Sequence, residues 1–171
     1  MADPVTVIEY DPRWPVRFDE ERVRLAAAFG DDAALIEHIG STSVPGLAAK
    51  PIIDVLVAAR RFPLGSATIA AMEALGYEHS GEYGIPGRAY FRRLSPRPRT
   101  HHVHAYAAGS DRITAHLLFR DYLRAHPAEA ARYADVKREL ARRQLDAVAF
   151  QSGKSAFIEE LLARAQRDDA V

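Results

Sequence analysis

The stretch from residue 35 to residue 57 constrains the fold of this chain more than any other part of the sequence. Leu35–Ile39 and Ile52–Val57 are short apolar runs typical of buried strands. The loop between them contains Gly40-Ser41-Thr42-Ser43, so that backbone N–H groups and three hydroxyls can turn toward an anion. Asp54 has apolar neighbours in the second run, which favours a place in a site over a place in solvent. The pattern predicts a strand, a phosphate-binding loop and a second strand.

The same loop has a structural interpretation as well. Its hydroxyl residues can cap a turn that leads into a short helix, without any ligand. Lys50, just before the second strand, can deliver a charge to a phosphate or form a surface salt bridge. Both interpretations stay open at the level of the residues.

Strands and helices alternate in the rest of the sequence, and a helical segment follows them. Trp14, Phe18 and Phe29 recur on one face of a helix that begins near Pro12 and ends at Gly30. Further strands are expected over Val5–Ile8, at a sheet edge, and over Arg88–Arg93 and Thr100–Tyr106, with a hairpin around Ser95–Pro98. Further helices are expected over Leu64–Leu75, from Asp111, from Pro127 and around Phe157–Ala165. This order predicts an α+β fold with a mixed β-sheet, flanking helices and a C-terminal helical segment from about residue 111.

Bulk properties exclude several classes of function. A length of 171 residues favours a single domain, and a formal net charge of zero argues against non-specific nucleic-acid binding by the whole surface. The chain contains no cysteine, so a disulfide framework, a zinc–thiolate site and a cysteine nucleophile are excluded. The N-terminal residues lack a basic segment followed by an apolar run, and no later run is long enough to span a membrane. We therefore expect a cytoplasmic protein without a membrane partner.

His102 and His104 form a candidate ligand pair. They are two residues apart on an expected strand, so their side chains share one face. If that strand lies beside the Asp54 strand, Asp54, His102 and His104 can form a two-histidine, one-carboxylate site for a divalent metal such as zinc or manganese. The alternative is that the two histidines only form hydrogen bonds within a cleft.

A cluster of arginines lies between residues 88 and 99. On an extended strand Arg88, Tyr90 and Arg92 share a face, and the two guanidinium groups can bind a phosphate or a carboxylate. Arg97 and Arg99 are expected to be solvated. The cluster is too short to predict nucleic-acid binding.

Several motifs together resemble one known family. Ile39–Leu47 followed by Lys50–Asp54 is similar to the signature of the GrpB family (UPF0157), within the nucleotidyltransferase superfamily related to polymerase beta. Similarity to the same family extends to Tyr10-Asp11-Pro12, Gly87–Arg92, His102–His104 and Phe119–Arg124. The resemblance implies a nucleotidyltransferase-like fold in which the Gly-Ser turn holds nucleotide phosphates and the next strand supplies paired carboxylates for a metal. Here Leu56 stands where the second carboxylate would be.

Two functions follow from these observations. The first is a metal-dependent nucleotidyltransferase-like enzyme acting on a nucleotide or another phosphorylated small molecule. Its catalytic residues would be Asp54 and His104. Phosphate or substrate would be bound by Gly40, Ser41, Thr42, Ser43, Lys50, Arg88 and Arg92. A magnesium, manganese or zinc ion would be bound by Asp54, His102 and His104. The alternative is a non-catalytic ligand-sensing or accessory module, with a protein partner, that keeps the ancestral cleft.

Overall fold

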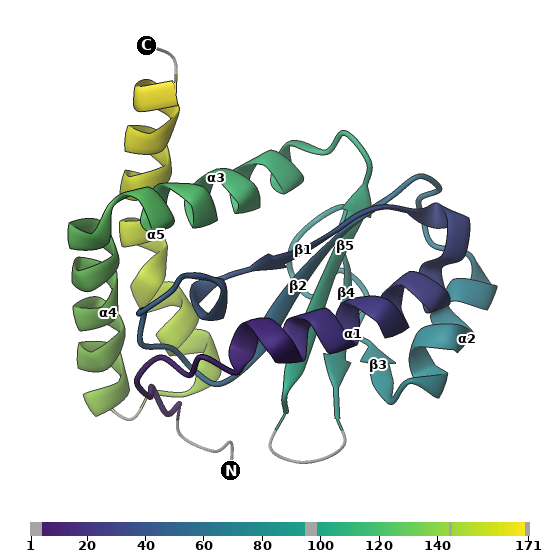
Figure 1. Cartoon of the computed structure of the whole chain (residues 1–171), viewed down its shortest axis with the longest axis horizontal. Coiled ribbons are helices and arrows are strands. Elements are labelled where there is room, and N and C mark those ends of the chain that lie inside the picture. The colour runs from purple at the N-terminus through teal and green to yellow at the C-terminus, as the bar shows by residue number, and fades with distance from the viewer. Residues whose placement is uncertain (1–4, 95–98, 144, 170–171) are drawn as a thin grey trace.

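A mixed β-sheet forms the centre of the molecule (Figure 1). The computed structural model describes residues 5–94, 99–143 and 145–169, and within them five strands pair in the order β1-β2-β5-β4-β3. Their bounds are Ala33–Ile39 for β1, Ile53–Ala59 for β2, Tyr77–His79 for β3, Ala89–Arg93 for β4 and His101–Ala107 for β5. β2 and β5 are parallel and the other neighbours are antiparallel. The parallel register places Asp54 opposite His102.

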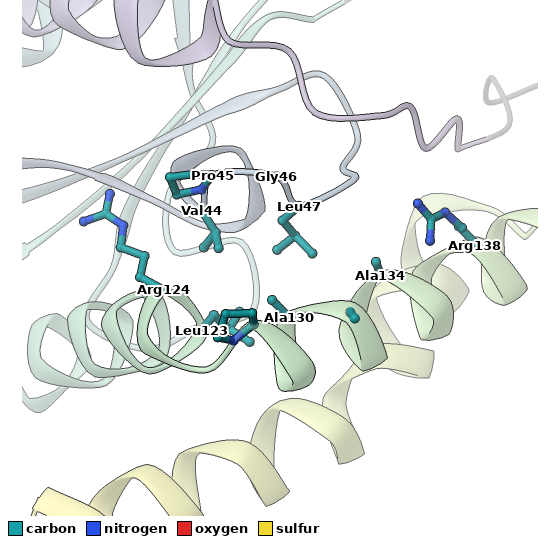
Figure 2. Close-up of a pocket in the computed structure, with 11 residues that line it drawn as sticks. Val44, Pro45, Gly46, Leu47, Leu123, Arg124, Ala130, Ala134 and Arg138 are labelled. Atoms are coloured by element: carbon teal, nitrogen blue, oxygen red, sulfur yellow. The ribbon is translucent and has the colours of Figure 1, made fainter.

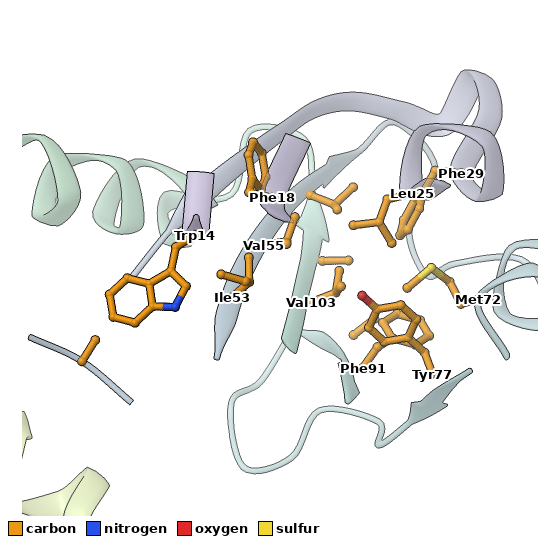
Figure 3. Close-up of a cluster of buried hydrophobic side chains, with 14 residues drawn as sticks. Trp14, Phe18, Leu25, Phe29, Ile53, Val55, Met72, Tyr77, Phe91 and Val103 are labelled. Carbon is orange, nitrogen blue, oxygen red and sulfur yellow. The ribbon is translucent and has the colours of Figure 1, made fainter. Parts of the chain in front are cut away.

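Helices α1 (Trp14–Phe29) and α2 (Ser66–Ala74) cover one face of the sheet. α1 has Pro15 in its first turn, where the missing N–H removes no helical hydrogen bond, and it ends at Gly30 with φ +54°. The alternation of side chains along each strand sends Val55 and Val103 into the core beneath these helices. Figure 3 shows this core, which is made of Trp14, Phe18, Leu25, Phe29, Ile53, Val55, Val57, Met72, Tyr77, Phe91 and Val103 among others.

The opposite face of the sheet is covered in part by α3 (Asp111–Ala125). Ile113 and Leu117 of α3 pack against Leu56, Ala58 and Tyr106 of the sheet. Asp54, His102, His104, Tyr90 and Arg92 lie on this same face by alternation, but they belong to none of the apolar clusters. We call the surface that these five residues form the polar face.

The C-terminal helices gather at one end of the sheet (Figure 1). α4 (Pro127–Arg142) and α5 (Ala147–Asp169) pack with α3 against the loop between β1 and β2. Leu161 and Tyr133 join Val44 and Leu47 of that loop in one buried cluster. The buried Lys137 of α4 donates a hydrogen bond to the backbone carbonyl of Ala48. The helical tail therefore supports the loop that precedes β2.

The α+β fold expected from the sequence is confirmed, with differences in detail. The edge strand expected over Val5–Ile8 is wrong, because only Ile8 forms a bridge, with Ala49. Extending that ladder would place Thr6 opposite Pro51, which has no N–H to donate. β3 was not expected, since three residues are too few to show a period. The expected hairpin turn at Ser95–Pro98 lies outside the described residues.

Among the helices that the structure describes, not one combines the length and the apolar character needed to cross a membrane.

Candidate functional site

Asp54 is the centre of the polar face. His104 Nε2 lies 3.2 Å from Asp54 Oδ1, and His102 Nδ1 lies 3.5 Å from the same oxygen. The Asp54 side chain keeps 30% of its surface exposed, so a ligand can reach it. The parallel pairing of β2 and β5 thus brings together the carboxylate and both imidazoles that the sequence placed in one group.

Gly40 lies directly against this carboxylate. It has φ +70°, a conformation that glycine adopts more readily than any other residue. A Cβ atom at this position would lie 2.9 Å from Asp54 Oδ2. The glycine is therefore required both for the turn after β1 and for the space that Asp54 occupies.

Arg88 extends the cluster beyond His104. Its Nη1 lies 3.4 Å from Nδ1 of His104. A guanidinium can only donate, so Nδ1 is the bare nitrogen and His104 carries its proton on Nε2, from which it donates to Asp54. Burial lowers the pKa of His104, partly offset by Asp54. Burial alone would raise the pKa of Asp54, but the hydrogen bonds from His102 and His104 outweigh it and hold that pKa well below the usual range.

The loop after β1 is ordered by its own hydroxyl groups. Ser41–Ser43 form one 3-10 turn, in which Ser43 Oγ donates to the Gly40 carbonyl at 2.5 Å. Thr42 Oγ1 donates to the Ile52 carbonyl at 3.3 Å and lies 2.9 Å from Nε2 of His38. Both Thr42 and Ser43 are buried, whereas Ser41 is half-buried. Of the predicted phosphate-binding hydroxyls, Ser41 is the one that these internal bonds leave available.

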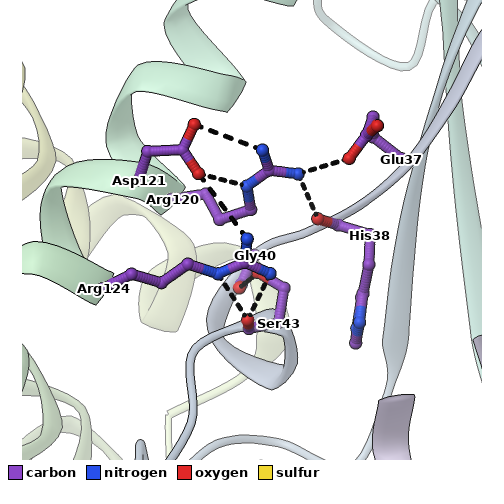
Figure 4. Close-up of polar contacts among 7 residues, drawn as sticks. All are labelled: Glu37, His38, Gly40, Ser43, Arg120, Asp121 and Arg124. Atoms are coloured by element: carbon purple, nitrogen blue, oxygen red, sulfur yellow. Dashed lines mark hydrogen bonds and ion pairs between the residues drawn. The ribbon is translucent and has the colours of Figure 1, made fainter. Parts of the chain in front are cut away.

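Two arginines of α3 fix the same loop from outside (Figure 4). Arg120 Nη1 donates to Glu37 Oε2 at 2.7 Å and to the His38 carbonyl at 3.1 Å. Arg124 donates through Nε and Nη2 to the Ser43 carbonyl, at 3.0 and 2.8 Å. Because Phe119–Arg124 resembles the family, the sequence leaves room for Arg120 to reach a shared site, but Arg124 was not expected there.

The other predicted phosphate ligands differ in their burial and in their hydrogen-bond partners. Arg88 is buried and also donates to the carbonyls of Glu82 and Tyr83, at 3.1 and 2.9 Å. Arg92 lies on the polar face but pairs with Glu78 and Ser80 of the sheet edge. Lys50 is exposed at the end of the loop.

Aromatic side chains complete the polar face. Ring centroids of Tyr90 and His104 are 5.1 Å apart, and those of His104 and His116 are 5.6 Å apart. Nε2 of His116, on α3, lies 3.4 Å from the hydroxyl of Tyr106. Burial lowers the pKa of His116 to about 4, so it is neutral at physiological pH. Tyr83, which stacks on Tyr90, gave no signal in the sequence, because it sits in a glycine-rich loop without a period.

The fit of this cluster to a metal is partial. Two donor atoms on one tetrahedral zinc ion lie about 3.3 Å apart, close to the 3.2 and 3.5 Å between Asp54 and the two histidines. His102 Nε2 is buried and has no hydrogen-bond partner in the part of the chain that the structure describes. Within those same residues, however, no group of three or more His, Asp or Glu side chains is already arranged to hold a metal ion. A metal would have to replace the present His–Asp contacts.

A separate pocket lies on another side of the loop (Figure 2). It has a volume of about 480 Å³ and is bounded by residues 44–47 of the loop and by α3 and α4. Its walls are apolar apart from Arg124 and Arg138. None of the polar-face residues around Asp54 lines it.

Comparison with known proteins places the chain in a family. The family model described as GrpB protein matches residues 4–164. The chain belongs to the GrpB family. UPF0157 protein YqkA of Bacillus subtilis is 46% identical over 95% of this GrpB chain. The match covers 48% of YqkA, so the chain spans about half the length of that relative. A dephospho-CoA kinase of Mycolicibacterium paratuberculosis is 27% identical over 82% of this chain and 40% of the kinase.

Solved structures agree with this assignment. The crystal structure of the conserved protein GrpB from Enterococcus faecalis has a TM-score of 0.90 and 40% identity, and the match covers 97% of this chain and 100% of that one. A crystal structure of the Cid1 poly(U) polymerase matches with a TM-score of 0.53 and 15% identity, over 80% of this chain and 44% of that one. The second match concerns the fold alone. The GrpB chain therefore has a nucleotidyltransferase-like fold, as its sequence resemblance implied.

Proposed function

We propose that this GrpB protein binds a nucleotide or another phosphorylated small molecule on its polar face. The observation that carries the proposal is the partly exposed Asp54 carboxylate, which lies against Gly40 and is held by His102 and His104. In this arrangement the turn at Gly40 and Ser41 borders the polar face at Asp54. Phosphate oxygens would meet the half-buried Ser41 hydroxyl on one side and Arg88 on the other.

Charge explains why a divalent cation belongs to the proposal. Asp54 is ionised, so it repels a phosphate placed beside it. A magnesium, manganese or zinc ion between carboxylate and phosphate removes that repulsion, and His102 can supply a nitrogen ligand. His104 can be a second ligand through Nε2 once its proton moves to Nδ1 and the contact of Nδ1 with Arg88 opens. Such an ion would polarise a phosphoryl oxygen and so assist group transfer. Before an ion binds, the chain itself orients the carboxylate through His104, which Arg88 contacts in turn.

A non-catalytic role is the second candidate. Leu56 occupies the position of a second carboxylate, and it is fully buried beneath α3 against Tyr106 and Ile113. A carboxylate there could not reach a metal on the polar face without opening that cluster. The match with part of a dephospho-CoA kinase supports a module that serves a larger protein. In this role the polar face binds its ligand without transferring a group.

Calorimetry of the wild-type protein and of Asp54→Asn tests the proposal. ATP, UTP and dephospho-coenzyme A serve as ligands, each with and without Mg²⁺, Mn²⁺ or Zn²⁺. We expect metal-dependent binding by the wild type, and a loss of at least tenfold in affinity in Asp54→Asn, because the amide carries no charge for the ion. Asp19→Asn, at an exposed position of α1, is the matched control and should bind like the wild type.

The outcomes separate the candidates. Binding that is equally tight without metal and in Asp54→Asn would reject the metal-bridged site. Metal-dependent binding favours the non-catalytic role if ³¹P NMR detects no release of pyrophosphate or phosphate. Failure of every ligand to bind the wild type would reject the proposed function as a whole.

A further inference from the structure

Tyr83 and Tyr90 form a continuous aromatic surface beside Asp54. The Tyr90 ring lies against both histidines, with centroids 5.4 Å from His102 and 5.1 Å from His104. The Tyr83 ring stacks on Tyr90 at 5.3 Å, with an angle of 29° between the planes. Tyr90 is only 7% exposed, whereas Tyr83 is 58% exposed. Tyr83 is thus the accessible end of a stack that begins at the Asp54 cluster.

The backbone of Tyr83 is held in an unfavourable conformation. Its φ is +46°, and no other non-glycine residue in the described ranges has a positive φ. An aromatic residue in the left-handed region carries a cost that a glycine would avoid. The chain keeps a tyrosine here although Gly81, Gly84 and Gly87 surround it. A strained backbone that carries a large exposed ring is explained if the ring itself contacts a ligand.

Arg88 and Glu82 fix the loop that presents this ring. Arg88 donates to the carbonyls of Glu82 and Tyr83, and the Glu82 carboxylate accepts a hydrogen bond from the Gly87 N–H at 2.7 Å. The loop is therefore tied to the same arginine that contacts His104. The ring and the Asp54 cluster are held in one arrangement, as a binding site requires.

Positive charge borders the aromatic surface. The Arg88 guanidinium carbon lies 4.3 Å from the centre of the Tyr90 ring, and that of Arg92 lies 5.0 Å from the centre of the Tyr83 ring. An aromatic ring that is more than half exposed, beside two guanidinium groups and a candidate phosphate site, matches the chemistry of a nucleotide, which has a flat base and an anionic end. Inorganic polyphosphate would leave the aromatic ring unused.

We propose that Tyr83 is the platform on which a nucleobase stacks, so that the phosphorylated ligand of the polar face is a nucleotide. The inference rests on the proposed function, since it assumes that phosphate lies near Asp54. Every base has a π-face, so stacking on Tyr83 discriminates little among the bases. The hydroxyl of Tyr83 is not required.

The test compares Tyr83→Gly, Tyr83→Leu and Tyr83→Phe with the wild type. Kd is measured by calorimetry for ATP, for UTP and for inorganic tripolyphosphate, in the presence of the same divalent metal. We expect Tyr83→Gly and Tyr83→Leu to bind both nucleotides about fivefold or more weakly and tripolyphosphate unchanged, because one stacked base is lost. Tyr83→Phe should bind like the wild type.

Thermal unfolding supplies a readout that a structural role would not produce. Tyr83→Gly relieves the left-handed strain, so its Tm should equal or exceed that of the wild type while its nucleotide affinity falls. A purely structural tyrosine would instead lose Tm together with affinity for every ligand.

The remaining outcomes are decisive in different ways. Unchanged nucleotide affinity in Tyr83→Gly, with weakened binding in Asp54→Asn, would overturn the platform and leave the proposed function intact. Wild-type protein that binds tripolyphosphate as tightly as ATP would also overturn the platform. Wild-type protein that binds none of the three, and no dephospho-coenzyme A either, overturns both.

Discussion

His38 shows how one buried residue orders the loop through its own contacts. Its ring stacks on Phe18 of α1, with centroids 4.9 Å apart, and its Nε2 lies 2.9 Å from Thr42 Oγ1. The Thr42 hydroxyl already donates to the Ile52 carbonyl, so the imidazole must donate from Nε2. Burial lowers the pKa of His38 to about 4. The native state therefore holds the imidazole neutral.

The pH dependence of stability follows from this shift. An unfolded histidine has a pKa near 6.5, so below that pH the unfolded chain takes up a proton that native His38 refuses. Stability should fall as pH drops from about 6.5 to about 4, by up to about 3 kcal/mol from this residue. His38→Gln keeps a donor for Thr42 but cannot titrate, so its urea-unfolding free energy should change less between pH 7.5 and pH 4.5. An identical change in variant and wild type would contradict this assignment.

The residues differ in how far they could be predicted. Asp54, His102 and His104 were placed together because alternation fixes which side chains share a face, and the resemblance marked the adjoining loop. Arg124 and Tyr83 could not be placed, since their roles depend on a helix docking against a distant loop and on a loop conformation without a period. Sequence pattern captures contacts set by strand geometry, and it misses contacts set by tertiary packing.

α3 is the element that joins the sheet to the helical tail. Arg120 reaches from it to Glu37 of β1 and to the His38 carbonyl, and Arg124 reaches to the Ser43 carbonyl. The Arg120 side chain is only 10% exposed, although the Glu37 side chain keeps 37% of its surface exposed. Charged hydrogen bonds in such surroundings are worth more than those between surface residues.

Replacing Arg120 should therefore loosen the loop as well as lower stability. We expect Arg120→Met to reduce the unfolding free energy by about 1–3 kcal/mol, because Glu37 and the His38 carbonyl lose their donor. Amide hydrogen exchange at Ser41–Ser43 should become faster. Arg22→Met removes an exposed arginine of α1, 3.7 Å from Asp19, and serves as the control with an expected change below about 0.5 kcal/mol. If the two variants lose the same stability, the contacts of Arg120 with Glu37 and the His38 carbonyl do not stabilise the fold.

At the scale of the whole molecule, two packed regions depend on each other. One core lies between the sheet and helices α1 and α2, and the second joins the Val44–Ala48 segment to α3, α4 and α5. The segment that the second core holds also carries the chain from the Gly40 turn into β2. Packing of the tail and geometry of the polar face are therefore linked.

Leu161 tests whether the tail and the loop share the second core. It is 2% exposed and packs in the second core, whereas its neighbour Leu162 is half-buried. Leu161→Ala should lower the unfolding free energy by about 2–5 kcal/mol, measured by urea unfolding, because it leaves a cavity. Leu162→Ala deletes the same atoms and should cost less. Equal losses in the two variants would mean that the tail does not share a core with the loop.

The parallel pairing of β2 with β5 has a consequence for the order of folding. Asp54 and His104 are 50 residues apart in sequence, and the pairing that unites them lies at the centre of the sheet. Closing so long a loop costs entropy before any contact repays it, so we expect this pairing to form late and to limit the folding rate. A nascent chain that ends before β5 would display Asp54 without either histidine. A ligand bound at the polar face as proposed would therefore need the complete sheet, and it would select finished molecules over partly folded ones.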